Sequence, residues 1–316
     1  MKAAIGIDIG GTKIAIGVVQ EDGNVLAKFE FPTEVEMGPD FATEQIISYL
    51  TEILNKFLIS GIGIGCPGPL DPRRGVVLSP PNLKSWHGYL LVDKIDSAFQ
   101  LPIRLLNDAD AAAFGEYFFT YRETYKHVLY VTVSTGIGGG IIINGSLYEG
   151  ALSGAGEIGH SVILPDGPIC GCGKYGCLET LASGTALNNI WKQRLIKEGK
   201  LVDPNWNSKD LFVKASENEP LALSVIEEAS TQLALGLSQV IQTLNPELLI
   251  LGGGVIIGQQ AYFEMVREKL PNYLLDQHSQ FLKIEKASQG SLAGMKGAAA
   301  SILSEVKDIG GIPNGI

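Results

Sequence analysis

Short apolar runs, separated by turns rich in glycine and proline, recur along the chain and predict buried strands. The first run covers residues 3–9 and leads directly into two glycines. Longer segments that mix apolar and polar positions predict helices. We expect strands at 3–9, 14–19, 25–31, 62–65, 101–106, 127–134, 141–143 and 248–251, and helices at 40–57, 109–118, 185–197, 208–216, 220–244 and 292–303.

A strand, a glycine turn and a second strand occur together twice, at residues 3–19 and again at 127–143. The second turn covers Thr135 to Gly140, and a third glycine turn follows at 252–254. This repetition predicts an α/β fold built by duplication, with two lobes around a cleft. We expect a small first lobe at 1–118, a large second lobe at 119–303 and a flexible tail at 304–316, with the helix at 292–303 able to pack back on the first lobe.

The chain is acidic, with 34 Asp and Glu against 24 Lys and Arg among 316 residues and a formal net charge of −10. This charge disfavours a phosphate backbone as partner, so we expect no nucleic-acid binding. No apolar run approaches the ~18 residues that a membrane span needs, and no signal-peptide pattern follows Met1. We therefore expect a cytoplasmic protein with reduced thiols and no membrane partner.

Three of the four cysteines lie close together at Cys170, Cys172 and Cys177, and His160 lies one short predicted strand upstream. Three thiolates and an imidazole form a closed tetrahedral zinc set. The glycines between the cysteines let the backbone turn tightly enough to direct the three sulfurs to one point. The spacing therefore predicts a structural zinc that shapes a loop.

Two alternatives remain for this cluster. A disulfide with one free thiol is the first, although Cys-x-Cys pairs bridge poorly. A catalytic zinc is the second, although four protein ligands leave no open position for a substrate. Two carboxylates would be tethered to the metal loop, because Glu157 lies three residues before His160 and Glu179 lies two residues after Cys177.

The turn after the first strand reads Asp8-Ile9-Gly10-Gly11-Thr12-Lys13, which is the composition of a phosphate-binding loop. Paired glycines let backbone N–H groups approach an anion, while Thr12 and Lys13 add a hydroxyl and a cation. Asp8 is suited to holding Mg²⁺ through its water shell. A plain β-turn with a surface acid is the alternative.

The predicted strand at 101–106 delivers Asn107 and Asp108 to its carboxyl end, just before an alanine-rich helix. Ligands of α/β sheets bind at such strand ends. The alternative for Asp108 is a helix N-cap. Proline-rich turns at 66–69 and 80–83, which contain Gly68 and Asn82, are stiff enough to hold polar groups in place.

Eight motifs, in order along the chain, resemble the ROK sugar kinases, a family of the superfamily of actin-like, Hsp70-like and hexokinase-like ATPases. The resemblance runs from about residue 3 to about residue 303. It departs at Cys66, where small aliphatic residues are more usual, and in the tail from Lys307 onward. The motifs are DIGGTK at 8–13, CPGPLD at 66–71, NDAD at 107–110, VSTGIGGG at 133–140, GEIGH at 156–160, CGCGKYGCLE at 170–179, ASG at 182–184 and LGGG at 251–254.

The resemblance implies a duplicated actin-like/RNase H-like ATPase fold with a structural zinc loop, and it assigns roles to individual residues. Asp108 matches the catalytic base. The set implied for ATP is Asp8, Gly10, Gly11, Thr12, Lys13, Thr135, Gly136, Gly138, Gly184, Gly253 and Gly254. The set implied for the sugar is Gly68, Asn82, Asn107, Asp108, Glu157, His160 and Glu179, and the zinc ligands are His160, Cys170, Cys172 and Cys177.

The activity that the resemblance implies is phosphorylation of a hexose by ATP with Mg²⁺, with glucose as the expected sugar and glucose 6-phosphate as the product. Kinases for N-acetylmannosamine, fructose or allose are the alternatives within the family. ROK repressors carry an N-terminal helix-turn-helix domain, whereas the first strand here follows Met1 directly. An Hsp70-like binding module would not need the zinc loop or the sugar carboxylates. A homodimer or homotetramer is expected from the resemblance alone.

Overall fold

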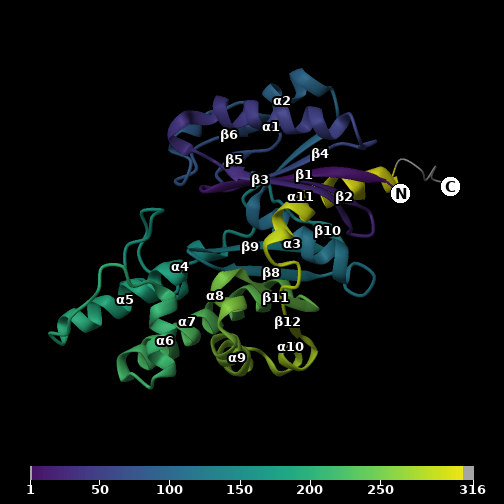
Figure 1. The fold of residues 1–316 in the computed structure, drawn as a ribbon. Coiled ribbons are helices and arrows are strands. Elements are labelled where there is room, and N and C mark those ends of the chain that lie inside the picture. The colour runs from purple at the N-terminus through teal and green to yellow at the C-terminus, as the bar shows by residue number, and fades with distance from the viewer. Residues whose placement is uncertain (1, 309–316) are drawn as a thin grey trace. The chain divides into compact units, whose positions relative to one another are not determined.

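The computed structural model describes residues 2–308, which form two five-stranded sheets with the same strand order (Figure 1). The first sheet runs β3-β2-β1-β4-β7 and the second runs β10-β9-β8-β11-β12. In each sheet the first strand in the chain lies at the centre, flanked by the second and fourth. The duplicated α/β fold predicted from the repeated turn unit is thus confirmed.

The first sheet combines two antiparallel with two parallel pairings. β1 pairs antiparallel with β2, which pairs antiparallel with β3, while β1, β4 and β7 are parallel neighbours. Parallel strands end at one edge of a sheet, so the ends of these three strands are brought together there. The strands are β1 (Ala3–Ile9), β2 (Lys13–Gln20), β3 (Val25–Pro32), β4 (Ile62–Cys66) and β7 (Ile103–Asn107).

Helices cover both faces of the first sheet (Figure 1). α1 (Gly38–Leu54) and α2 (Leu91–Phe99) lie on one face, and α3 (Asp108–Glu116) and α11 (Ala293–Asp308) lie on the other. Burial on both faces explains why β1 is an almost continuous apolar run. α11 approaches β1 closely because Gly6 has no side chain, and a Cβ there would collide with the Met295 backbone.

Short elements complete this half of the chain. β5 (Leu70–Asp71) and β6 (Val76–Val77) form a two-stranded sheet, and a π-helical turn at Tyr117–Tyr121 follows α3. The 3-10 turns of the whole described chain are Val35–Met37, Lys84–Trp86, Ile158–His160, Leu270–Tyr273 and Gly290–Leu292.

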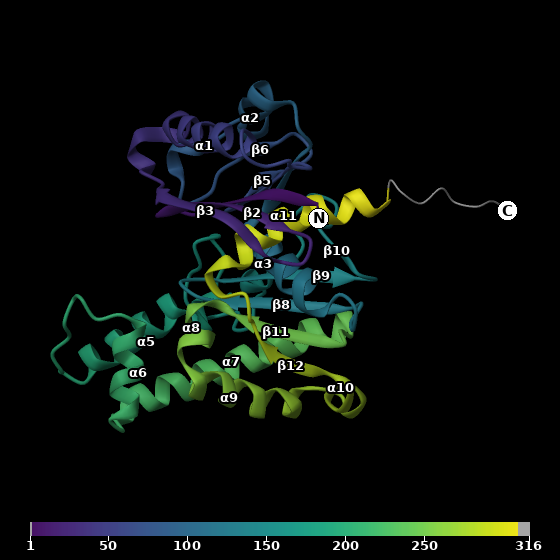
Figure 2. The same ribbon diagram turned by 45° about the vertical axis from the view of Figure 1, so that its right-hand side comes forward.

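In the second sheet β8, β11 and β12 are parallel, and β9 pairs antiparallel with β10. The strands are β8 (Val128–Val133), β9 (Ile137–Ile143), β10 (Ser146–Leu147), β11 (Leu248–Gly252) and β12 (Lys283–Lys286). The long helix α7 packs against α5, α6 and α9 (Figure 2). The helices are α4 (Glu179–Ala182), α5 (Gly184–Lys197), α6 (Ser208–Ser216), α7 (Pro220–Leu244), α8 (Gly253–Gly258), α9 (Gln260–Lys269) and α10 (Asp276–Phe281).

The glycine run at 138–140 lies in a strand and not in a turn, contrary to the sequence prediction. β9 begins at Ile137, and the turn itself is tight, with Ser134 N–H donating to the Gly136 carbonyl at 2.9 Å. A Cβ on Gly139 would meet the Ile158 side chain at 2.5 Å, and one on Gly140 would collide with the Ala113 Cβ. These glycines therefore serve close packing within the strand.

Two of the predicted helix ends also differ from the structure. The helix expected at 109–118 is α-helical only to Glu116 and then widens into the π-helical turn. α11 continues to Asp308, past the predicted end at 303, so residues 304–308 of the predicted tail are helical. Residues 309–316, the rest of that tail, lie outside the described residues.

Contacts between Cα atoms divide the described residues into two compact units. The first unit comprises 2–124, 140–155 and 289–308, and the second comprises 125–139 and 156–288. The predicted lobes at 1–118 and 119–303 are drawn differently and stay a prediction. Over residues 2–308, no helix combines the length and the apolar character that crossing a membrane requires.

Candidate functional site

Asp8 lies at the end of β1 as a half-buried carboxylate inside the first unit. Burial and the neighbouring charge of Asp108 raise the pKa of Asp8 to about 6, although Lys13 acts to lower it. Gly294 of α11 packs directly on this carboxylate, because a Cβ at that position would lie 2.8 Å from the Asp8 Cγ. The residue therefore retains a proton more readily than an ordinary aspartate and is poised to exchange it for a cation.

Asn107 and Asp108 join the end of β7 to the start of α3. Asn107 is the N-cap, and its Oδ1 accepts a hydrogen bond from the Ala109 N–H at 2.9 Å. This finding corrects the alternative in which Asp108 was the cap, because the asparagine has the extended backbone that a cap requires. Asp108 is the first residue of the helix, and its Oδ1 also accepts from the Ala109 N–H, at 2.8 Å.

The Asp108 side chain is accessible to solvent, yet the protein around it displaces enough water to raise the pKa of its carboxyl. The hydrogen bond from the Ala109 N–H works in the opposite direction and is the smaller effect. An accessible carboxylate with a raised pKa is a stronger proton acceptor than an ordinary surface aspartate. Its position at a strand end suits contact with a substrate.

Two loops of the first unit contact residues next to these carboxylates in the chain. A Cβ on Gly68 would lie 3.0 Å from the Asn107 Nδ2, and one on Gly11 would lie 3.4 Å from the Asn82 Cβ. The glycine turn, the two proline-rich loops and the end of β7 thus converge within one unit. Lys13 lies at the start of β2, where its Nζ contacts the Glu30 carboxylate at 2.7 Å.

Cys66, the residue that departs from the family pattern, is buried at the end of β4 and pairs in register with Asn107. Burial raises the pKa of its thiol, and the charges of Asp108 and Asp8 raise it further. The thiol therefore stays neutral. Cys66 is a packing residue near the two carboxylates.

In the second unit, a tight turn ends β8 and is closed by Glu179. The Glu179 Oε2 accepts a hydrogen bond from the Ile137 N–H at 2.9 Å, and a Cβ on Gly136 would collide with the same oxygen. The N–H of Gly184 donates to the Ser134 carbonyl at 2.8 Å, which ties the start of α5 to this turn. Glu179 thus has one oxygen committed to the turn.

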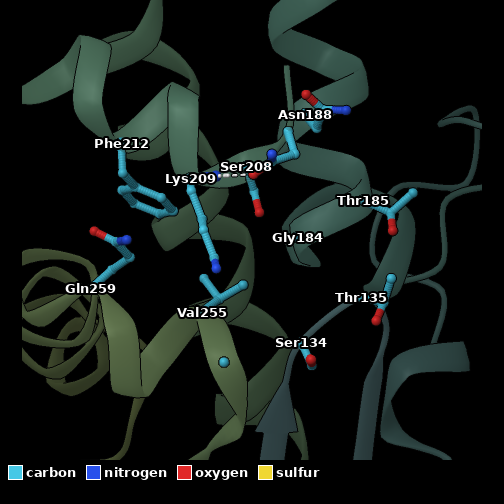
Figure 3. A pocket seen from close by; sticks show the side chains of 12 residues that line it. Ser134, Thr135, Gly184, Thr185, Asn188, Ser208, Lys209, Phe212, Val255 and Gln259 are labelled. Carbon is cyan, nitrogen blue, oxygen red and sulfur yellow. Dashed lines mark hydrogen bonds between the residues drawn. The ribbon is translucent and has the colours of Figure 1, made fainter. Parts of the chain in front are cut away.

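A pocket of about 310 Å³ lies beside this turn in the second unit (Figure 3). Of the residues assigned to ATP, Thr135, Gly184 and Gly254 line it. Gly253 is not one of the lining residues. It has a φ of +85°, and a Cβ there would collide with the backbone of Val133. The other lining residues come from the turn after β8, from α5, from α6 and its cap, and from α8 and the residue that follows it: Ser134, Thr185, Asn188, Asn207, Ser208, Lys209, Phe212, Val255 and Gln259.

The α6 contribution to this pocket was missed from the sequence. Asn207 caps α6 in a capping box with Asp210, and Ser208, Lys209 and Phe212 follow on the helix. Figure 3 shows the Lys209 and Phe212 side chains entering the same space as Gln259. A capping box is the only signal at these positions, and it predicts a helix start but not a ligand.

The four predicted zinc ligands lie together in the second unit, with their ligand atoms all within 4.8 Å of one another. The Cys170 Sγ is 3.4 Å from the His160 Nδ1, and the Cys172 and Cys177 Sγ atoms are 3.7 Å apart. Two Zn–S bonds of about 2.3 Å at a tetrahedral angle place their sulfurs about 3.8 Å apart, so the cluster has the size of a zinc site. All four cysteines are free, so the disulfide alternative is not seen.

The second ring nitrogen of His160 faces away from the sulfurs. Its Nε2 lies 3.9 Å from the Glu157 Oε2, and both side chains are open to solvent, at 38% and 56% exposed. One imidazole can therefore offer Nδ1 to a metal and Nε2 to a ligand beside Glu157. This arrangement fits the two roles that the resemblance implies for His160.

Comparison with known proteins gives the same result over nearly the whole chain. Residues 4–305 match the ROK family. The chain is 32% identical to the glucokinase of Thermotoga maritima over 96% of this chain and 98% of that one. It is also 30% identical to an N-acetylmannosamine kinase of Salmonella heidelberg, over 93% of this chain and 96% of that one.

Solved structures agree in fold. A ROK hexokinase from Thermus thermophilus has a TM-score of 0.86 at 34% identity, covering 97% of this chain and 99% of that one. A ROK glucokinase from Streptomyces griseus, in complex with glucose and AMPPNP, has a TM-score of 0.77 at 33% identity, with 94% and 98% covered.

Proposed function

The chain belongs to the ROK family, and from this membership we propose that it is an ATP-dependent hexose kinase that converts ATP and D-glucose to ADP and D-glucose 6-phosphate. Similarity to the T. maritima and S. griseus glucokinases supports the choice of sugar. The observation that carries the proposal is the accessible Asp108 carboxylate of raised pKa, at a strand end beside Asp8 and the glycine turn.

Asp108 acts as the general base in this proposal. A sugar hydroxyl is a poor nucleophile, and a carboxylate that takes its proton while the new O–P bond forms assists the reaction by about 10²–10⁴-fold. The proton passes from the 6-hydroxyl to the Asp108 carboxylate, and the bond between the γ-phosphorus and ADP breaks. The raised pKa of Asp108 favours proton capture in that step.

The remaining residues hold the nucleotide and neutralise charge. The turns at Gly10–Lys13 and Thr135–Gly136 offer backbone N–H groups to phosphate oxygens. Magnesium, when bound, screens the charge that spreads over the phosphoryl oxygens, and Asp8 is the residue that we propose to hold it through water. Mg²⁺ would compete with the proton that the raised pKa of Asp8 favours.

We assign sugar recognition to residues that lie close in sequence to the Cys₃His cluster. Glu157, the His160 Nε2 and Glu179 would pair with vicinal hydroxyls, and Asn107 and Asn82 would add amides. Fixed carboxylates and amides reject an epimer because a buried polar group is then left unpaired. The Cys₃His donor set fits a structural zinc, which His160 and the three cysteines would hold.

Two other functions have specific support. Similarity to the S. heidelberg N-acetylmannosamine kinase favours that sugar as the second candidate. The chain is also 31% identical to a xylose repressor of Caldicellulosiruptor bescii, over 96% of this chain and 78% of that one, which keeps sugar-responsive regulation as a remote candidate. The expected homodimer or homotetramer stays a prediction.

A panel of sugars tests the proposal. Glucose, mannose, fructose, allose, N-acetylglucosamine and N-acetylmannosamine would each be supplied with ATP and Mg²⁺, and ADP release would be measured by a coupled assay. We expect glucose to give the highest kcat/KM. A kcat/KM for N-acetylmannosamine well above that for glucose would make N-acetylmannosamine the proposed substrate instead. ADP release that no sugar stimulates would contradict the proposed sugar kinase activity.

A further inference from the structure

The pocket in the second unit has a single charged side chain among the twelve residues that line it. That side chain is Lys209, because Asp, Glu, Arg and His do not occur among the lining residues. Lys209 is exposed, and its side chain extends from α6 into the pocket toward Val255 (Figure 3). The pocket therefore presents one positive charge, with no acid in its walls to neutralise it.

The ammonium of Lys209 has no carboxylate partner among the side chains that the structure describes. The neighbouring Asp210 is committed to the helix cap, where its Oδ2 accepts a hydrogen bond from the Asn207 N–H at 2.8 Å. Lys214 of the same helix, in contrast, pairs with Glu217 at 2.8 Å. The charge of Lys209 is thus available to a ligand in the pocket.

The equivalent glycine turns of the two sheets differ in charge. β2 begins with Lys13 directly after the first turn, whereas β9 begins with Ile137 at the same place after the second. Thr135 and Gly136 can therefore offer a hydroxyl and N–H groups to a phosphate, but no cation. Charge-assisted hydrogen bonds to phosphate are about twice as strong as neutral ones, so a cation from another element would strengthen this turn as a phosphate site.

Close contacts hold the start of α6 beside the second turn. The Gly184 N–H donates to the Ser134 carbonyl at 2.8 Å, and a Cβ on Gly184 would lie 3.4 Å from the Ser208 Oγ. Ser208 directly precedes Lys209, and both line the pocket together with Ser134 and Thr135. The flexible stem of a lysine can therefore carry its ammonium to a phosphate bound at the turn.

We propose that Lys209 binds a phosphate of the nucleotide and supplies the cation that the turn at Thr135–Gly136 lacks. The inference rests on the proposed function, because it takes this pocket to be the nucleotide site. An ammonium pairs with phosphate oxygens as a point charge. Lys209 thus favours ligands that carry phosphate and contributes little to the binding of a nucleoside.

Equilibrium binding of ADP and adenosine to the intact protein tests the inference, because adenosine lacks phosphate. Calorimetry at low salt would compare the wild type with Lys209→Gln and Lys209→Arg. We expect Lys209→Gln to weaken ADP binding by about 5- to 50-fold, between the effect of an exposed ion pair and that of a charge-assisted hydrogen bond, and adenosine binding by less than about twofold. Lys209→Arg keeps the charge and should stay within about threefold of the wild type. The loss in Lys209→Gln should shrink as salt is added.

Lys214→Gln is the matched control, because Lys214 lies on the same helix, carries the same charge and does not line the pocket. It should bind ADP as the wild type does. Lys209→Gln should melt no lower than the wild type, because a cation in the first turn of a helix opposes the helix dipole. A loss of ADP binding in that variant would then not come from a loss of folding.

Unchanged ADP binding by Lys209→Gln would overturn the inference, and so would equal losses of ADP and adenosine or an equal loss in Lys214→Gln. Wild-type protein that bound ADP no more tightly than adenosine would overturn it without any variant. An unchanged KM for ATP in Lys209→Gln, with full sugar-dependent turnover, would overturn this inference alone. A loss of ADP binding confined to Lys209→Gln, in a protein without sugar-dependent turnover, would overturn only the proposed kinase.

Discussion

The two sheets share one strand order, but equivalent strand ends carry different chemistry. In the first sheet Asp8 lies one residue before the end of β1, and Asp108 directly follows β7, and both carboxyls have a raised pKa. In the second sheet β8 is followed by the neutral residues Ser134 and Thr135, and β11 leads into Gly253 and Gly254. The scaffold thus determines where the strand ends lie, and the residues at those ends determine whether a unit presents ionisable carboxylates or neutral side chains.

Replacing Asp108, the proposed general base in the first unit, should have the largest effect. Asp108→Asn keeps the size of the side chain but cannot accept a proton, so kcat should fall by about 10²–10⁴-fold. The dissociation constant for glucose should change much less, because Glu157, His160 and Glu179 are expected to bind the sugar as well. Steady-state kinetics and calorimetry on the same preparation separate the two quantities.

Asp93→Asn is a suitable control, since Asp93 is an exposed aspartate in the first turn of α2. It should retain wild-type turnover. A folded Asp108→Asn protein that kept more than about a tenth of wild-type turnover, well short of a general-base loss, would place the base elsewhere, and Asp110 would be tested next.

Disrupting the Cys₃His cluster of the second unit should reduce turnover less than Asp108→Asn does. Cys172→Ser removes one of four ligands, so the zinc content should fall from about one per chain toward zero. The KM for glucose should rise about 10- to 100-fold, because Glu157 and Glu179 lose their support. Elemental analysis of chelator-free protein measures the first quantity, and kinetics measures the second.

Cys66→Ala provides the contrast within the first unit, because this buried cysteine lies outside the ligand cluster. Its zinc content should match that of the wild type. Wild-type protein that contained no zinc when freshly purified would refute the metal site.

The smallest effect concerns the pH dependence of stability. A carboxyl whose pKa rises from 3.8 to about 6 on folding is protonated more in the folded than in the unfolded state. Stability should therefore fall as pH rises from about 4 to about 6, by up to about 3 kcal/mol. Asp8→Asn should remove this slope, so the variant should melt at a higher temperature than wild type at pH 7.5.

At pH 4 the wild type is protonated at Asp8, and the two proteins should melt within a few degrees of each other. Thermal melts across this range, without nucleotide or Mg²⁺, provide the measurement. Equal melting temperatures at both pH values would mean that the pKa of Asp8 is not raised by desolvation. The contrast between the two units would then rest on the raised pKa of Asp108 alone.

Much of the framework could be predicted because local pattern and tertiary structure agree. The apolar run of β1 ends at Asp8, and α6 and α7 begin and end where their caps and periodicity predict. The Cys₃His cluster was predictable because its four residues are close in sequence and belong to only two soft donor types.

The rest depends on contacts between distant segments. Glycine spacing alone does not distinguish a turn from a strand, so Gly139 and Gly140 were assigned to the turn, whereas their neighbours Ile158 and Ala113 explain their place in β9. The α6 wall of the pocket has the sequence of an ordinary helix start.

The central claim is that a phosphoryl group passes from ATP to a hexose hydroxyl. It is tested most directly by following the label from [γ-³²P]ATP in the presence of Mg²⁺ and glucose. We predict that wild-type protein places the label on the 6-oxygen of glucose and that Asp108→Asn protein at equal concentration does so at least about a hundredfold more slowly. Label that appears only as inorganic phosphate, at a rate unchanged by glucose or by the substitution, would contradict the account.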